Sequence, residues 1–331
     1  MFDERHSSVW TRAMFGAAVL LLACLSGVQA AQDLTLGHVG IGDDPAQTAA
    51  RAFVAQLERR LPGRFNIIDK GGSSLGSEGD IWEAVSLGGI DIAIVSTVGV
   101  TPFVPQIGIL DVPFLFRDSL HAAKVLNGPI GRDLGANFLE KGLVCLGFIE
   151  IGFRQVTNSK RPIREPSDIA GLRIRLPPSQ IYELTFKALG AEVIAMPFTE
   201  VYGALDDERI DGQENPILRI AGAHFDRVQN FIALTNHAFT PAVILINEGV
   251  WKSLTRADRA EFLAATSATV KAFPKALAEA EGAAIVAFKE NGISVSERVD
   301  RDAFISALAP LRPEWEKRFG ANMLKRIENT F

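Results

Sequence analysis

Short apolar segments alternate with amphipathic helical stretches from residue 34 onward. Apolar residues recur at helical spacing from Ala46 to Leu61, behind the cap and N1 proline of Asp43-Asp44-Pro45. The predicted strands cover residues 34–39, 65–69 and 90–95, and the predicted helices cover 45–61 and about 78–87. Such alternation is typical of parallel strands covered by helices on both faces, so the pattern predicts an α/β fold.

The same pattern starts again further along the chain. Its predicted elements are helices over 119–126 and 130–140, a buried strand at 143–148, strands at 172–176 and 191–196, and helices over 179–189 and 199–209. We place a lobe boundary near Gly152, where strand and helix units begin again after a loop. An apolar strand at 242–247 cannot be assigned to either group by pattern alone.

A long helical pattern runs from Thr255 to about Glu290. Thr255 and Asp258 form a capping-box arrangement, and Asn291-Gly292 closes the segment. Because Pro274 lies inside it, we expect a kink or break in the preceding turn. An unbroken helix would be about 50 Å long, enough to brace two lobes. Two ordinary helices divided at the proline are the alternative.

The N-terminus has the three-part order of a secretory signal peptide. Arg5 and Arg12 precede an uncharged apolar run over 13–25, and Val28-Gln29-Ala30 offers a small-residue cleavage site. We expect residues 1–30 to be removed, which places the mature protein in the periplasm. A retained anchor and lipoprotein processing at Cys24 are alternatives, although the apolar run is short for a bilayer span of about 20 residues.

Composition and charge exclude several classes of protein and of partner. The 331 residues, 47% hydrophobic and 22% charged, suit a globular protein of two domains. With residues 1–30 removed, Cys145 is the one cysteine left, so no intramolecular disulfide can form. The formal net charge of −5 argues against nucleic acid as a partner, because nucleic acid demands a basic face.

Two signals for enzyme or metal chemistry can be tested on the sequence. The segment Gly72 to Gly76 fits G-x-S-x-G between a predicted strand and helix, which suits either a nucleophile elbow at Ser74 or a glycine-rich turn. The mature histidines have no metal-ligand spacing, so we expect no metal site. His38 differs from the others because it falls at the carboxyl end of the first strand, where open α/β sheets bind ligands.

Sharper signals lie in the second group of units. In Gly171-Leu-Arg-Ile-Arg-Leu-Pro177 the apolar residues share one face and the two arginines the other. Arg175 is nearer the carboxyl end of the strand, where its planar fork can bind a carboxylate; two solvated arginines on an edge strand are the alternative. The run Asp211 to Pro216 (D-G-Q-E-N-P) is a predicted polar turn whose amides can orient a carboxylate or simply face solvent.

Taken together, these motifs resemble the substrate-binding proteins of tripartite ATP-independent periplasmic (TRAP) transporters, of the dicarboxylate-binding type. The resemblance covers nearly all of the mature chain. Its most specific stretches are G-F-R-Q at 152–155, G-L-R-I-R at 171–175, M-P-F-T-E-V-Y at 196–202 and D-G-Q-E-N-P at 211–216. Supporting matches are S-S-L-G at 73–76, D-V-P-F-L-F at 111–116 and T-N-H at 235–237.

The resemblance implies two α/β lobes joined by a hinge, with a long helix spanning both and a ligand clamped between them. It assigns residues 31–152 and 241–280 to the first lobe and residues 153–240 and 281–331 to the second. The loop around Ser74 is then a structural element rather than a nucleophile elbow.

The resemblance also implies a set of ligand-binding residues. Arg175 pairs with the ligand carboxylate, Arg154 and Asn215 assist it, and Phe198 packs on the ligand. In the first lobe, Glu78 reads ligand hydroxyls, and Ser96 and His38 fall at or beside positions that vary with substrate.

The function we expect is capture of a small organic carboxylate, which can be a C4-dicarboxylate, a sugar acid or a related hydroxy acid. The expected partners are that ligand and the membrane subunits of a TRAP transporter. No catalytic residue, cofactor or enzymatic activity is expected. A secreted serine hydrolase using Ser74 and a ligand-sensing domain for a membrane receptor are the alternatives.

Overall fold

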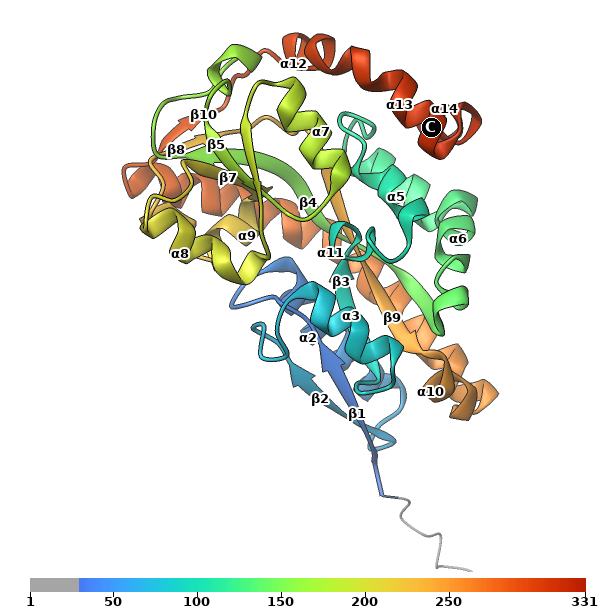
Figure 1. The fold of residues 1–331 in the computed structure, drawn as a ribbon. Helices are drawn as coiled ribbons and strands as arrows, with labels where there is room; N and C mark the ends of the chain where they lie inside the picture. The colour runs from blue at the N-terminus through green and yellow to red at the C-terminus, as the bar shows by residue number, and fades with distance from the viewer. Residues whose placement is uncertain (1–29) are drawn as a thin grey trace, which may run out of the picture.

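The structure is a computed structural model that describes residues 30–331, so the predicted signal peptide, including Cys24, lies outside the described residues except for Ala30. Its strands are β1 (Gln32–Gly37), β2 (Phe65–Lys70), β3 (Ile92–Ser96), β4 (Leu143–Asn158), β5 (Arg173–Leu176), β6 (Glu192–Ala195), β7 (Gly212–Pro216), β8 (Phe231–Ala233), β9 (Phe239–Asn247) and β10 (Ser294–Ser296). They follow the order β2-β1-β3-β9-β4-β7-β5-β6, with β8 and β10 joined to β4 at the side. Two α/β lobes result, one built on β1 to β3 and the other on β5 to β7 (Figure 1).

The helices of the described residues include one at each predicted position and six that were not predicted, and those predicted over 130–140 and 199–209 are shorter than expected. They are α2 (Pro45–Arg60), α3 (Glu78–Ser86), α4 (Thr97–Val100), α5 (Ser119–Asn127), α6 (Pro129–Ala136), α7 (Gln180–Ala188), α8 (Val201–Asp206), α9 (Ile217–Gly222), α10 (Glu248–Ser253), α11 (Arg256–Glu290), α12 (Arg301–Leu308), α13 (Arg312–Phe319) and α14 (Ala321–Glu328). Asp44 caps α2 by accepting from the Ala46 amide, as its place before Pro45 predicts. Within residues 30–331 no helix is long and apolar enough to cross a membrane.

The sheet is mixed rather than wholly parallel. β1 pairs in parallel with β2 and β3, and β5 pairs in parallel with β6 and β7. β9, which pattern alone could not assign, lies between β3 and β4 and is antiparallel to both. The expectation of parallel strands is therefore wrong at the centre, because β9 enters the first lobe from the second instead of following one of its helices.

The expectation of a loop before Gly152 is wrong, because strand β4 runs through this position. The strand is continuous for 16 residues and passes from one lobe to the other. Its first part pairs with β9 and its last part with β7 and β8. The register shifts between Glu150 and Gly152, and Gly152 has φ of 122°, a conformation that favours glycine. The predicted boundary thus coincides with a β-bulge, and the domain limits at 152, 240 and 280 stay predictions.

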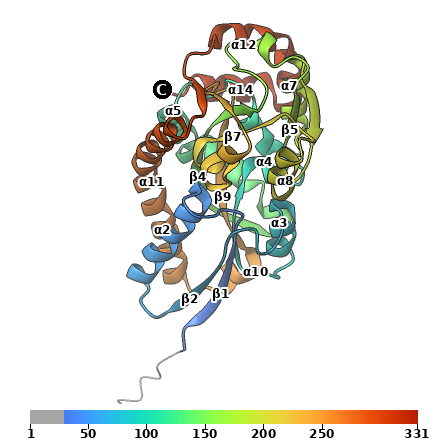
Figure 2. The ribbon, with the colours of Figure 1, turned by 90° about the vertical axis from the view of Figure 1, so that its left-hand side faces the viewer.

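α11 is one helix of 35 residues, so the alternative of two helices divided at Pro274 is wrong. Thr255 and Asp258 form the predicted capping box. The helix contacts α2 in the first lobe and α9 and β10 in the second. Figure 2 shows it running along one side of the molecule, where it braces both lobes as predicted.

The last helix, α14, packs on the first lobe. Leu324 and Ile327 of α14 are buried in the same apolar cluster as Leu134 of α6 and Val243 of β9. A fully buried side chain of this size contributes about 1.5–3 kcal/mol. The second lobe has its own cluster, centred on β5 and α7 with Phe304 of α12. The two clusters are not confined to single lobes, since Ile181 of α7 packs in the first and Val98 of α4 in the second.

Candidate functional site

A cavity of about 230 Å³ lies between the two lobes, and both line it. The first lobe contributes Glu78, at the start of α3, and Phe103. The second contributes Arg175, on β5, and Phe198, which opens a short 3-10 turn at residues 198–200. The remaining lining residues are Ser77, Gly79, Val98, Gly99, Pro102, Pro177, Pro178 and Pro197. An apolar wall with a few fixed charges is typical of a small-molecule site.

Arg175 presents a buried and incompletely paired guanidinium. Its Nε and Nη2 donate to the Met196 carbonyl oxygen at 3.0 and 2.7 Å, and Nη1 has no hydrogen-bond partner among the described residues. The residue is 2% exposed, and burial, with the nearby Arg154 and Arg219 charges, lowers the pKa of its guanidinium to about 9. β5 lies between β6 and β7. The alternative of a solvated arginine on an edge strand is therefore wrong for Arg175.

Arg154 is buried as well, but the protein itself satisfies it. Its Nε and Nη2 bind the Glu214 carboxylate, Nη1 donates to Thr240 at 2.9 Å, and Nη2 reaches Asn215 Oδ1 at 3.2 Å. His237 Nε2 is 3.1 Å from the same Glu214 carboxylate. Burial pushes the pKa of Glu214 up, but the Arg154 charge and the hydrogen bonds from His237 and Arg154 outweigh burial and leave that pKa lowered. Arg154 and Asn215 thus lie together, and neither is among the residues that line the cavity.

The D-G-Q-E-N-P run is a strand and not the predicted turn. Gly212–Pro216 forms β7 between β4 and β5, and all five residues are buried. Its polar side chains find partners inside the protein: Asn215 Nδ2 donates to Gln213 Oε1 at 2.5 Å, and Gln213 donates to Thr157 at 3.0 Å. Because these side chains find partners within β7 and on the neighbouring β4, a strand can bury side chains that normally mark a turn.

Glu78 is the carboxylate of the opposite wall. It opens α3, and its oxygens accept from the Ser96 hydroxyl at 2.6 Å and the Ser96 amide at 3.1 Å. Ser96 in turn caps α4 by accepting from the Gly99 amide at 3.1 Å. These bonds join two of the three predicted first-lobe residues, of which Glu78 lines the cavity.

Arg219, which lies beside the site, was missed by the sequence analysis. Arg219 of α9 is buried, donates to Asp44 at 3.0 Å and lies 3.5 Å from Glu78. Its guanidinium also sits over the Phe198 ring, 5.3 Å from the centroid. A lone arginine among Ile217, Leu218 and Ile220 is a signal that could have found it, since a cation in an apolar helix needs a buried partner.

His38 does not line the cavity. Its Nε2 is 2.9 Å from Asp69, and its Nδ1 accepts from the Gly40 amide at 3.1 Å. Burial lowers the pKa of the imidazole although Asp69 opposes that shift. The structure therefore places this predicted ligand residue in a hydrogen-bonded pair with Asp69 and not at the cavity.

The Ser74 loop has no elbow geometry. Ser74 is exposed, Ser73 has φ of 58°, and Gly72 and Gly76 also have positive φ, as in a tight turn. His38 approaches this loop at Gly71, but both of its ring nitrogens are already engaged. Across residues 30–331 no group of three histidine, cysteine or carboxylate side chains is placed to hold a metal.

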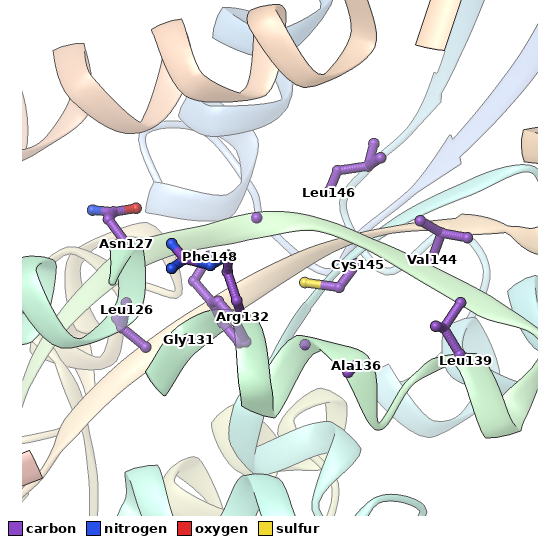
Figure 3. Close-up of a pocket in the computed structure, with 12 residues that line it drawn as sticks. Leu126, Asn127, Gly131, Arg132, Ala136, Leu139, Val144, Cys145, Leu146 and Phe148 are labelled. Carbon is purple, nitrogen blue, oxygen red and sulfur yellow. The ribbon is translucent and has the colours of Figure 1, made fainter. Parts of the chain in front are cut away.

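A second cavity, of about 340 Å³, lies between α6 and β4 (Figure 3). Its wall is mainly apolar and includes Cys145 and the exposed Arg132. Burial raises the pKa of the Cys145 thiol to about 12, so the thiolate is not favoured there. None of the predicted ligand residues lines this cavity.

Comparison with known proteins supports the same architecture. Residues 36–318 match the bacterial extracellular solute-binding proteins, family 7. The chain is 36% identical over 321 residues to the 2,3-diketo-L-gulonate-binding periplasmic protein YiaO of Escherichia coli, covering 96% of this chain and 97% of that protein.

Solved structures agree with the sequence match. A TRAP periplasmic solute-binding protein from Polaromonas bound to D-erythronate is 37% identical with a TM-score of 0.88, over 90% of this chain and 99% of that one. A TRAP protein from Sulfurospirillum deleyianum with bound succinate is 28% identical with a TM-score of 0.86, over 92% and 100%. The protein belongs to the bacterial extracellular solute-binding proteins, family 7, whose members serve transport, and it has their two-lobed fold.

Proposed function

We propose that this protein captures a small organic carboxylate in the cleft between its lobes, in the periplasm, and delivers it to the membrane subunits of a TRAP transporter without chemical change. The observation that carries the proposal is Arg175, whose buried guanidinium borders the cavity with Nη1 free of protein partners among the described residues. A ligand carboxylate would supply the missing counter-charge.

The energetics favour an anion at this point. Burial depresses the pKa of Arg175, which means that the protein alone stabilises its charge less well than water does. A carboxylate beside Nη1 would offset that cost with a charge-assisted hydrogen bond in a cleft of low dielectric. Closure of the lobes around the pair would then strengthen it.

The opposite wall argues for the class of ligand. Glu78 has fixed oxygens that can accept from hydroxyl groups, whereas a second ligand carboxylate beside them would be repelled. A hydroxy acid or sugar acid with one carboxylate therefore suits the cavity better than a C4-dicarboxylate. D-erythronate in the Polaromonas relative and diketogulonate in the name of YiaO belong to this class.

Isothermal titration with D-erythronate and succinate tests the proposal. In the parent protein D-erythronate should bind more tightly than succinate. Arg175→Ala should weaken D-erythronate binding by roughly 10²–10⁴, about 3–5 kcal/mol, because it removes one member of a desolvated ion pair. The matched control is Arg173→Ala, on the same strand but paired with Asp211 at 2.7 Å outside the cavity. Equal binding by Arg175→Ala and Arg173→Ala would refute the role of Arg175.

A further inference from the structure

Arg219 is a buried cation at the boundary between the lobes. It lies on α9 among apolar neighbours and is 4% exposed. Burial alone would lower the pKa of its guanidinium, but the charges of Asp44 and Glu78 outweigh burial and raise it. Unlike Arg175, this arginine already has its counter-charges within the protein.

Those counter-charges come from the other lobe. α9 follows β7 in the second lobe, whereas Asp44 caps α2 and Glu78 opens α3 in the first. Nε of Arg219 lies 3.0 Å from Asp44, and Nη1 lies 3.5 Å from Glu78. One guanidinium therefore bridges two helix N-termini of the first lobe, and one of its partners borders the cavity.

The backbone beside Arg219 also meets the first lobe. A Cβ atom on Gly222, at the end of α9, would lie 3.1 Å from the Ile41 carbonyl oxygen and 3.6 Å from Asp44 Cβ. The three nearest atoms to that position all belong to residues 41–44. A glycine here permits the close approach that the Arg219–Asp44 bond requires.

We propose that Arg219 is a positioning residue that ties the two lobes together across the cleft and fixes the Glu78 carboxylate toward the ligand. The orientation of Glu78 toward a ligand rests on the proposed function, whereas the tie between the lobes does not. Glu78 then has two roles. Its carboxylate meets ligand hydroxyls, and its ion pair with Arg219 helps to hold the cleft closed.

The tie is reversible on physical grounds. In the closed cleft the three charged groups attract one another, but all three have lost water, and these terms largely offset each other for buried ion pairs. Opening would return water to Asp44, Glu78 and Arg219 together. Closed and open forms can then be close in free energy, so that a ligand can shift the balance between them.

Double electron–electron resonance on protein without added ligand tests the tie directly. Spin labels at Glu83→Cys on α3 and Asp206→Cys on α8, both exposed, report the distance between lobes in a Cys145→Ser background. The parent should have a substantial short-distance population. Arg219→Met should lower the ratio of short to long distances at least tenfold, and Arg219→Lys should restore part of it, because one ammonium can reach Asp44 or Glu78 but not both. Arg173→Met, which removes an ion pair within one lobe, should leave the distribution unchanged.

A second variant keeps the test independent of the folding of an Arg219 variant. Gly222→Val retains all three charges but crowds Ile41, so it should also populate the long distance. An unchanged distribution in Gly222→Val and in any folded Arg219→Met, or a parent that is wholly open, would overturn the tie. The proposed function is tested separately by Arg175→Ala. This variant should lose D-erythronate binding while its distance distribution stays that of the parent, because Arg175 makes no bond to the first lobe among the described residues.

Discussion

Arg154 and Arg175 are both buried at this site, but their hydrogen-bond partners differ. Arg154 is enclosed by Glu214, Thr240 and Asn215, and the pKa of its guanidinium is raised because the Glu214 charge outweighs burial. Arg175 has one carbonyl acceptor and a pKa of about 9. A buried charge without a carboxylate of its own is poised for a ligand, whereas a paired one supports the wall.

The lowered pKa of Arg175 predicts a pH dependence of binding. Below pH 9 the guanidinium is protonated and the affinity for D-erythronate should be nearly constant. Above that pH the free protein loses the proton that the bound form retains, so the affinity should fall, approaching tenfold per pH unit. Titration calorimetry at pH 7, 8, 9 and 10 measures it, with unfolding followed at each pH as a control. A flat profile to pH 10 would contradict this assignment.

At the residue scale, the sequence predicted which side chains belong to the site better than it predicted their hydrogen-bond partners. Alternation along residues 172–176 identified Arg175, but its Met196 acceptor depends on the neighbouring strand. Arg219 and Asp44 are 175 positions apart, and no local pattern encodes such a contact. His38 was predicted as a ligand residue because it follows the end of its strand, but it is hydrogen-bonded to Asp69 and does not line the cavity.

At the element scale, the connection between lobes depends on β4, β9 and α11. The bulge of β4 brings Gly152 against α11, where a Cβ atom would lie 2.5 Å from Glu281 Oε1. Glu150, on the same bulge, is 5% exposed and its Oε1 has no hydrogen-bond partner among the described residues. Burial raises the pKa of both carboxyl groups to about 7, and for Glu150 the Glu281 charge adds to the shift. These two carboxyl groups beside the β4 bulge therefore keep their protons up to about pH 7.

These carboxyl groups predict how stability changes with pH. A carboxyl group whose folded pKa is raised binds its proton more tightly in the folded protein, so its ionisation lowers the free energy of unfolding as pH rises from about 4.5 to 7. Glu150→Gln removes that penalty and should stabilise the protein by about 1–3 kcal/mol at pH 8 but little at pH 4.5. Urea unfolding at both pH values measures the difference. The exposed Glu140→Gln is the matched control, and an equal effect of Glu150→Gln at both pH values would count against ionisation as the cause.

Element boundaries could be predicted where neighbouring residues determine them. The predictions failed where pairing with distant strands determines the structure. The caps of α2 and α11 were identified from Asp44 and Thr255 because capping needs only neighbouring residues. β7 was predicted as a turn because its composition is polar, and its side chains are satisfied by one another and by the adjacent β4. The length of α11 could not be decided across Pro274, since packing against both lobes supports the helix there.

At the scale of the whole molecule, the site exists only when the lobes meet. Glu78 and Phe103 come from one lobe, Arg175 and Phe198 from the other. A ligand can enter when the cleft is open and is retained when it closes, so closure should act on the dissociation rate more than on the association rate. This expectation separates residues that contact the ligand from residues that hold the lobes together.

Gly222→Val tests that separation, because Gly222 lies at the lobe boundary and is not part of the cavity lining. A Cβ atom there crowds Ile41 and should weaken closure while leaving Arg175 and Glu78 in place. Stopped-flow fluorescence with D-erythronate should then give a dissociation rate at least tenfold faster, a change of about 1.4 kcal/mol, with an association rate within a factor of about three of the parent. Arg175→Ala should instead lose affinity without opening the lobes, since it removes the counter-ion and not the tie. If Gly222→Val slowed association and left dissociation unchanged, the ligand would be captured by a cleft that is already closed, and retention would not depend on the contact between α9 and residues 41–44.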